Sequence, residues 1–118
     1  MKIRCKGNSL RYRLTRSDLS QLAATGNIND KIDFGEYSLT YSIKRTDGER
    51  LSAIFKNNII TLFMPASMII EWLSTDRVGF ENYDGPLHLL VEKDFTCLDN
   101  VSEDQSDNFP NPLAVKMS

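Results

Sequence analysis

Five basic residues alternate along the start of the chain, at the spacing that places them on one face of a β-hairpin. They are Lys2, Arg4, Lys6, Arg11 and Arg13. Gly7 and Asn8 between them are typical of a two-residue turn, which pairs Arg4 with Arg11 and Lys2 with Arg13. Like charges that face each other across two strands are unfavourable unless an anion lies among them. The pattern therefore predicts a face that attracts negative charge.

Three interpretations of this basic face stay open from the sequence. The side chains can splay apart into solvent, or the acidic end of the chain can fold back across them through Glu103, Asp104 and Asp107. The third is an external phosphate, nucleotide or nucleic acid. Nucleic-acid binding is disfavoured by the net charge of −2 and by the lack of aromatic residues among those that face outward on this hairpin.

His88 is the single histidine, and it lies between Leu87 and Leu89 in a predicted strand, with its side chain on the opposite face from theirs. Such a histidine is usually structural. A metal or thiol site needs partners, and the candidates combine soft and hard ligands without a recognised spacing. The candidate partners are Cys97, Asp99, Glu103, Asp104 and Asp107. A metal-dependent or thiol enzyme centred on His88 and Cys97 is thus the second hypothesis, with no catalytic residue and no cofactor assigned.

The elements that carry these residues follow from the spacing of apolar positions. Alternation of Ile3 with Cys5, and of Leu10, Tyr12 and Leu14, predicts two strands with Cys5 in the core. A capping box of Thr15 and Asp18, followed by an apolar stripe and Gly26, predicts a helix over about 16–25. Short strands are expected around residues 32–34 and 39–43.

The same order of elements returns in the second half of the chain. We expect strands over 51–56 and 59–64, a helix from Pro65 with a stripe of Ile69, Trp72 and Leu73, and strands around 78–80 and 87–91. At an offset of 50 residues Lys6 matches Lys56, Asn8 matches Asn58, Leu10 matches Ile60 and Leu22 matches Trp72. This agreement predicts an internal duplication with repeats of about 1–49 and 50–98.

The predicted fold class is α+β, with a duplicated ββαββ unit. We expect a mostly antiparallel curled sheet or barrel of about eight strands, with two short helices and a pseudo-two-fold axis. Tyr12, Tyr41, Phe55 and Trp72 fall on inner faces and are expected in the core. Ile54 and Phe63 fall on the outer face of the second hairpin, which predicts cover by a helix or a homodimer contact there.

Composition places the chain among ordinary globular proteins, since 41% of the residues are hydrophobic and 25% are charged. We expect one domain over residues 1–98 and an acidic, proline-containing tail over 99–118. No apolar run suits a signal peptide or a membrane span, and the two cysteines do not form a disulfide framework. A cytoplasmic protein is therefore predicted. Dinucleotide, Walker and GxSxG motifs are all absent from the sequence.

Two segments resemble a family of short, mostly bacterial proteins of unknown function. They are MKIRCKGNSLRYRLT at the start and VEKDFTCLDNVSEDQSDNFPNP near the end. The resemblance implies a self-contained domain and draws attention to Cys97 and the tail carboxylates without a role for them. The favoured hypothesis from the sequence is a non-catalytic binding or interaction domain, whose basic hairpin takes its own tail or an anionic partner.

Overall fold

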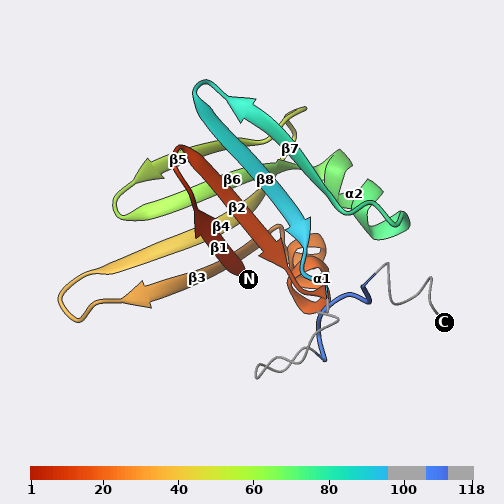
Figure 1. Cartoon of the computed structure of the whole chain (residues 1–118), viewed down its shortest axis with the longest axis horizontal. Coiled ribbons are helices and arrows are strands. Elements are labelled where there is room, and N and C mark those ends of the chain that lie inside the picture. The colour runs from red at the N-terminus through yellow and green to blue at the C-terminus, as the bar shows by residue number, and fades with distance from the viewer. Residues whose placement is uncertain (96–105, 112–118) are drawn as a thin grey trace.

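Two four-stranded sheets lie against each other in the computed structural model, which describes residues 1–95 and 106–111 (Figure 1). The first sheet has the order β1 (Lys2–Cys5), β2 (Ser9–Leu14), β8 (Leu87–Lys93) and β7 (Gly79–Asp84). The second has the order β3 (Asn27–Asp33), β4 (Ser38–Thr46), β6 (Ile59–Pro65) and β5 (Ser52–Lys56). Helix α1 (Arg16–Thr25) follows β2, and helix α2 (Ala66–Ser74) follows β6. The predicted α+β class is confirmed, with eight strands and two helices among the described residues.

Each sheet is mixed, which corrects the expectation of one mostly antiparallel curled sheet or barrel. The outer strands pair antiparallel with their neighbours, whereas the central pairs β2–β8 and β4–β6 are parallel. The physical reason lies in the helices. Helix α1 carries the chain from β2 into the other sheet, so the free edge of β2 is filled by β8, which runs in the same direction. The described strands form no closed barrel.

The two sheets have the same strand arrangement. When four is added to each strand number, counting on from β8 to β1, the order β1-β2-β8-β7 becomes β5-β6-β4-β3, which is the order of the second sheet. Each sheet therefore joins the hairpin that precedes the helix in one predicted repeat to the hairpin that follows the helix in the other. Both helices follow the central strands, so they lie at the opposite end from the turns that precede β2 and β6 (Figure 1).

Helix α1 begins and ends as the sequence predicts. The Thr15 hydroxyl accepts a hydrogen bond from the Asp18 backbone N–H at 3.3 Å, and the Asp18 carboxylate accepts one from the Thr15 N–H at 3.0 Å. Gly26 ends the helix at φ 76°, where its N–H donates to the Leu22 carbonyl at 2.8 Å. This left-handed conformation is why a glycine stands at the position.

The core lies between the sheets and under the helices. Tyr12 and Leu62 are fully buried at matching positions of β2 and β6, and Trp72 is 1% exposed. The Trp72 ring meets Phe80 edge-on at 5.7 Å, and its indole N–H donates to the Arg77 carbonyl at 2.9 Å. The prediction of core positions for Tyr12 and Trp72 is thus confirmed.

Two other aromatic residues that the sequence predicts in the core are more exposed than expected, because the second sheet extends past the first at its hairpin ends (Figure 1). Phe55 has the expected inner-face position but is 68% exposed, and Tyr41 is half-buried.

Two strand boundaries differ from the predicted ones. Strand β3 ends at Asp33, whose carboxylate accepts from the Gly35 N–H at 2.8 Å, so Phe34 lies in the turn rather than in the strand. Strand β7 begins at Gly79, after Val78.

Neither described helix is long and apolar enough to cross a membrane, since they have 10 and 9 residues.

Candidate functional site

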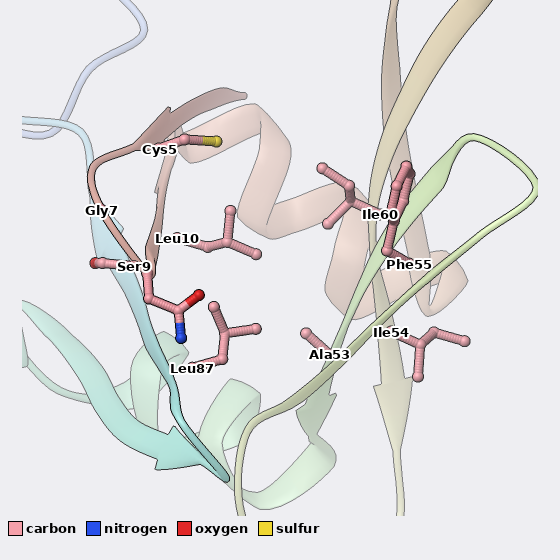
Figure 2. Close-up of a pocket in the computed structure, with 10 residues that line it drawn as sticks. Cys5, Gly7, Ser9, Leu10, Ala53, Ile54, Phe55, Ile60 and Leu87 are labelled. Carbon is pink, nitrogen blue, oxygen red and sulfur yellow. The ribbon is translucent and has the colours of Figure 1, made fainter.

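A cleft of about 310 Å³ lies between the first hairpin, formed by β1 and β2, and the second hairpin, formed by β5 and β6 (Figure 2). Its lining residues come from both hairpins and from the start of β8. They are Cys5, Gly7, Asn8, Ser9, Leu10, Ala53, Ile54, Phe55, Ile60 and Leu87. In Figure 2, Cys5, Leu10 and Leu87 project from the first sheet toward Ala53 and Ile60 of the second. None of these described lining side chains carries a charge.

Tight turns place the two hairpins on either side of this cleft. Gly7 has φ 55° in the first turn, and Asn57 and Asn58 have φ 54° and 62° in the second. Glycine and asparagine tolerate this left-handed region, which two-residue hairpin loops require. Because such turns fix the register, Cys5 faces Leu10 and Phe55 faces Ile60 within their own hairpins. These are the positions that form the two walls.

The second wall is attached to the first sheet by side chains of β7. Asn82 accepts from the Leu51 N–H and donates to the Leu51 carbonyl, both at 2.9 Å. The Asp84 carboxylate accepts from the Ala53 N–H at 3.0 Å. The backbone groups in these bonds lie at the free edge of the second sheet, where they would otherwise be buried without a hydrogen bond. The bonds therefore satisfy these groups and also fix the distance between the two walls.

Cys5 is exposed and lines the cleft, which corrects its predicted place in the core. It has the expected inward orientation, but the end of the sandwich away from the helices is open. Deeper in the same strand pair, Tyr12 is fully buried, and its hydroxyl has no hydrogen-bond partner among the described residues. Burial raises the pKa of Tyr12, and the neighbouring Cys5 thiol adds to the effect. Among the described residues, the lining holds no histidine or carboxylate that could activate the thiol.

The basic face of the first hairpin has the predicted register, with Arg4 opposite Arg11 and Lys2 opposite Arg13. Acidic side chains in β8 and just after it offset part of this positive charge, which the sequence pattern did not predict. Glu92 of β8 forms an ion pair with Arg11 and lies 4.0 Å from Arg13. The Lys2 ammonium lies 3.2 Å from the buried carboxylate of Asp94. Arg4 and Lys6 have no ion-pair partner among the described residues.

Asp107 is the one tail acid of the predicted three that the structure describes, and it lies at the start of α1. Its carboxylate accepts from the Ser17 hydroxyl at 3.0 Å, and its backbone carbonyl accepts from the Arg16 N–H at 3.2 Å. Hydrogen bonds from Ser17 and Thr15 lower the pKa of Asp107. Glu103 and Asp104 lie outside the described residues. The observed contact of Asp107 is therefore with a helix start rather than with the predicted basic residues.

Phe109 anchors the same segment. Its N–H donates to the Asp94 carbonyl at 2.9 Å, and its ring meets Phe95 at 6.2 Å. This part of the predicted tail is packed against the core.

His88 lies on the outer face of the first sheet with two partners from β7. Its Nε2 is 2.9 Å from the Glu81 carboxylate, and its ring stacks on Tyr83 at 4.6 Å. Asp107 lies beyond the opposite end of β8, so these two candidate ligands are not brought together. Cys97, Asp99, Glu103 and Asp104 fall outside the described residues. Among the residues that the structure does describe, no group of three or more histidine, cysteine, aspartate or glutamate side chains could hold a metal.

The model of a protein family of unknown function, DUF7009, matches residues 1–113 of the chain. This protein belongs to the DUF7009 family. The predicted resemblance to an uncharacterised family is thereby confirmed. A comparison of this DUF7009 member with curated proteins finds no match, and a comparison with solved structures finds none either. The function has to be argued from the site itself.

Proposed function

We propose that this protein is a non-catalytic binding domain that takes small, largely apolar molecules in the cleft between its two hairpins. The cleft itself is the observation that carries the proposal. Its volume of about 310 Å³ falls at the lower end of the range for ligand pockets, about 300 to 1,000 Å³. Its walls are mainly aliphatic or aromatic, with a few neutral polar groups from the first turn. This composition is typical of sites that bind small molecules.

The chain is also proposed to be an internal duplication with repeats of 1–49 and 50–98 and a pseudo-two-fold axis. The matching strand orders of the two sheets support this proposal. The cleft supports it as well, since Leu10 and Ile60 stand at the same offset of 50 residues as Cys5 and Phe55, and all four line the cleft. The ligand site would thus lie where the equivalent hairpins of the two repeats meet. The boundary at residue 98 stays a prediction, and the packing of Phe109 favours a folded unit that includes part of the tail.

The anion-binding role of the first hairpin also stays a prediction. The ion pairs favour two of the five basic residues for this role. Arg11, Arg13 and Lys2 have acidic neighbours in or next to β8, whereas Arg4 and Lys6 are exposed without one among the described residues. A homodimer through the second hairpin likewise stays a prediction. Ile54 is 52% exposed and Phe63 is half-buried on the outer face of the second sheet.

Replacement of Ala53 by phenylalanine tests the proposed site, because the new ring would fill the space between Ala53 and Leu10. The wild-type protein is titrated with octanol while the amide and methyl NMR signals of the lining residues are followed. We expect shifts of the Leu10, Ile60 and Leu87 signals, and at least about a tenfold loss of affinity in the Ala53→Phe variant, since an occupied pocket removes most of the buried ligand area.

Ala24→Phe is the matched control, because it makes the same chemical change at an exposed position of α1. This variant should bind octanol as the wild type does. Thermal unfolding of both variants checks that each remains folded. Octanol shifts that spread over the surface and stay unchanged in the Ala53→Phe variant would contradict the proposed site.

A further inference from the structure

Strands β1 and β5 are edge strands at matching places in the two sheets, but their edges differ. The Lys6 N–H donates to the Ser9 carbonyl at 3.2 Å across the first turn. Since hydrogen-bonded pairs alternate along an antiparallel ladder, the backbone N–H and carbonyl groups of Ile3 and Cys5 point away from β2. These groups have no hydrogen-bond partner among the described residues.

The matching edge of β5 is satisfied by β7. At the repeat offset of 50 residues Ile3 matches Ala53, whose N–H donates to the Asp84 carboxylate at 3.0 Å. Strand β3 is the counterpart of β7 beside β1. The N-terminal amine lies 3.5 Å from the carboxylate of Asp30, and two residues further along β3 has Ile32, whose side chain accepts no hydrogen bond. The edge of β1 is therefore left open to another strand.

A strand added to this edge would lie over the second sheet. Strand β1 lies above one row of side chains in that sheet, since its start contacts Asp30 and its end lies across the cleft from Ile60. Neighbouring strands are about 4.8 Å apart, and successive side chains on one face are about 7 Å apart. The next strand position therefore lies above the next row, Ile32 and Leu39, toward the β3–β4 turn that extends past β1 (Figure 1).

The surface under this position is apolar and exposed. Ile32 is 43% exposed, and Phe34 and Tyr37 are 70% and 72% exposed. The Phe34 N–H donates to the Tyr37 carbonyl at 2.8 Å, which continues the pairing of Ile32 with Leu39 and places all four side chains on one face. Phe34, Tyr37 and Leu39 also line a hollow of about 260 Å³. Apolar side chains of an added strand would be buried here.

The outward side chains of β1 select the charge of the added strand. Arg4 and Lys6 are exposed on the outer face and have no ion-pair partner among the described residues. Acidic residues beside them on the added strand would form favourable cross-strand pairs, whereas β1 of a second copy would bring like charges together. The edge is thus complementary to a strand whose acidic and apolar residues alternate.

We propose that the edge of β1 binds an extended segment of a partner protein in which acidic residues alternate with apolar ones. The backbone of the segment pairs with the free groups of β1. Its acidic side chains lie beside Arg4 and Lys6, and its apolar side chains cover Ile32 and Leu39. This interaction goes beyond the proposed small-molecule site and does not depend on it, because it uses the edge of β1 rather than the space between the hairpins.

Two capped peptides of about seven residues test the proposal, one alternating glutamate with valine and the other lysine with valine. Each is titrated into the full chain while the amide NMR signals of Ile3 and Cys5 are followed. The glutamate peptide should shift both signals and protect both amides from hydrogen exchange. It should bind at least about tenfold more tightly than the lysine peptide, since the cross-strand charge pairs change from attractive to repulsive. Equal affinities, or shifts confined to other strands, would contradict the proposal.

Cys5→Pro removes the free N–H without removing a bond to β2, and an edge strand tolerates proline at such a position. We expect at least about a tenfold loss of affinity for the glutamate peptide, because the N–H would otherwise donate to the peptide backbone. Cys5→Ala is the matched control, since it changes the same side chain but keeps the N–H, and it should bind as the wild type does. Thermal unfolding checks that both variants are folded. Wild-type affinity in Cys5→Pro would exclude backbone pairing at this edge.

Arg4→Gln with Lys6→Gln should lower affinity for the glutamate peptide about fivefold, from the loss of two cross-strand charge pairs. Lys31→Gln with Lys44→Gln is the control, because it makes the same charge change at exposed positions of the second sheet and should leave affinity unchanged. Equal losses in the two variants would show that the attraction is not local to β1. Sedimentation of the full chain tests a second copy as the occupant. A dimer that Cys5→Pro converts to a monomer would overturn the proposal.

Discussion

The first and second hairpins have matching positions in the fold but are held in place by different interactions. Tyr12 and Leu62 stand at equivalent buried positions, and Cys5 and Phe55 stand at equivalent positions in the cleft. Outside the cleft the two differ. Side chains of the first hairpin form ion pairs with β8, mainly with Glu92. Backbone groups of the second wall form hydrogen bonds with side chains of β7.

This difference shows how one element, the β7–β8 hairpin, can fix both walls of a cleft by two kinds of interaction. Hydrogen bonds to a buried backbone have strict geometry, so the second wall should be rigidly placed. Charge pairs between partly exposed side chains are tolerant and weak, so the first wall should depend on them little. The comparison therefore predicts unequal effects when each connection is removed.

Removal of the Asn82 side chain should have the largest effect. Asn82→Ala leaves the N–H and carbonyl of the fully buried Leu51 without their partners, and we expect a loss of about 2 to 3 kcal/mol in the free energy of unfolding. Chemical denaturation measures this loss. Asn29→Ala is the control, because Asn29 is exposed on β3 and should change stability by less than about 0.5 kcal/mol. Equal effects of the two substitutions would remove the proposed role of β7.

Tyr12 and Leu62 offer a comparison inside the two hairpins. The Tyr12 hydroxyl is buried without a partner among the described residues, while the equivalent Leu62 has no polar group. We expect Tyr12→Phe to stabilise the fold by about 1 kcal/mol, because it removes a polar group that is buried without a hydrogen bond. Denaturation curves of the two proteins provide the measurement. A loss of stability instead would show that the hydroxyl has a partner, a bound water for example.

Glu92→Gln should have the smallest effect. Arg11 and Arg13 then lie opposite Arg4 and Lys2 without the carboxylate that the two arginines share. We expect a loss of about 0.5 to 1 kcal/mol in the free energy of unfolding at low salt. The difference from wild type should shrink between 0.1 M and 1 M salt, where the screening length falls from about 10 Å to about 3 Å. Glu36→Gln, an equal charge change in the exposed turn after β3, should cost less than about 0.5 kcal/mol at either salt concentration. A difference for Glu92→Gln that does not respond to salt would exclude the electrostatic explanation.

Local features of the fold could be predicted from the sequence, because they depend on neighbouring residues. The register of the first hairpin follows from the Gly7–Asn8 turn, and the limits of α1 follow from Thr15 and Gly26. The parallel pairing of β2 with β8 could not be predicted in this way. It joins Arg13 to Glu92 across most of the chain, and local alternation of apolar residues carries no information about which strand lies beside which.

The candidate site was missed for the same reason. Cys5 and Phe55 have the predicted inner-face positions, and an inner face usually means a buried core. Whether an inner face is covered depends on how far the opposite sheet reaches, which only the tertiary arrangement decides. The exposed fraction of 68% for Phe55 expresses this difference most clearly. One signal was present in the sequence, namely that Leu10 and Ile60 match at the repeat offset just after both turns.

The contacts of bound octanol test most directly whether the two hairpins form one binding site. Isotope-filtered NMR would detect magnetisation transfer between the octanol methylene protons and the methyl groups of the protein. We predict contacts to both Leu10 of the first hairpin and Ile60 of the second. Contacts to one hairpin alone, or to exposed methyl groups such as that of Ile70 on α2, would contradict a shared cleft.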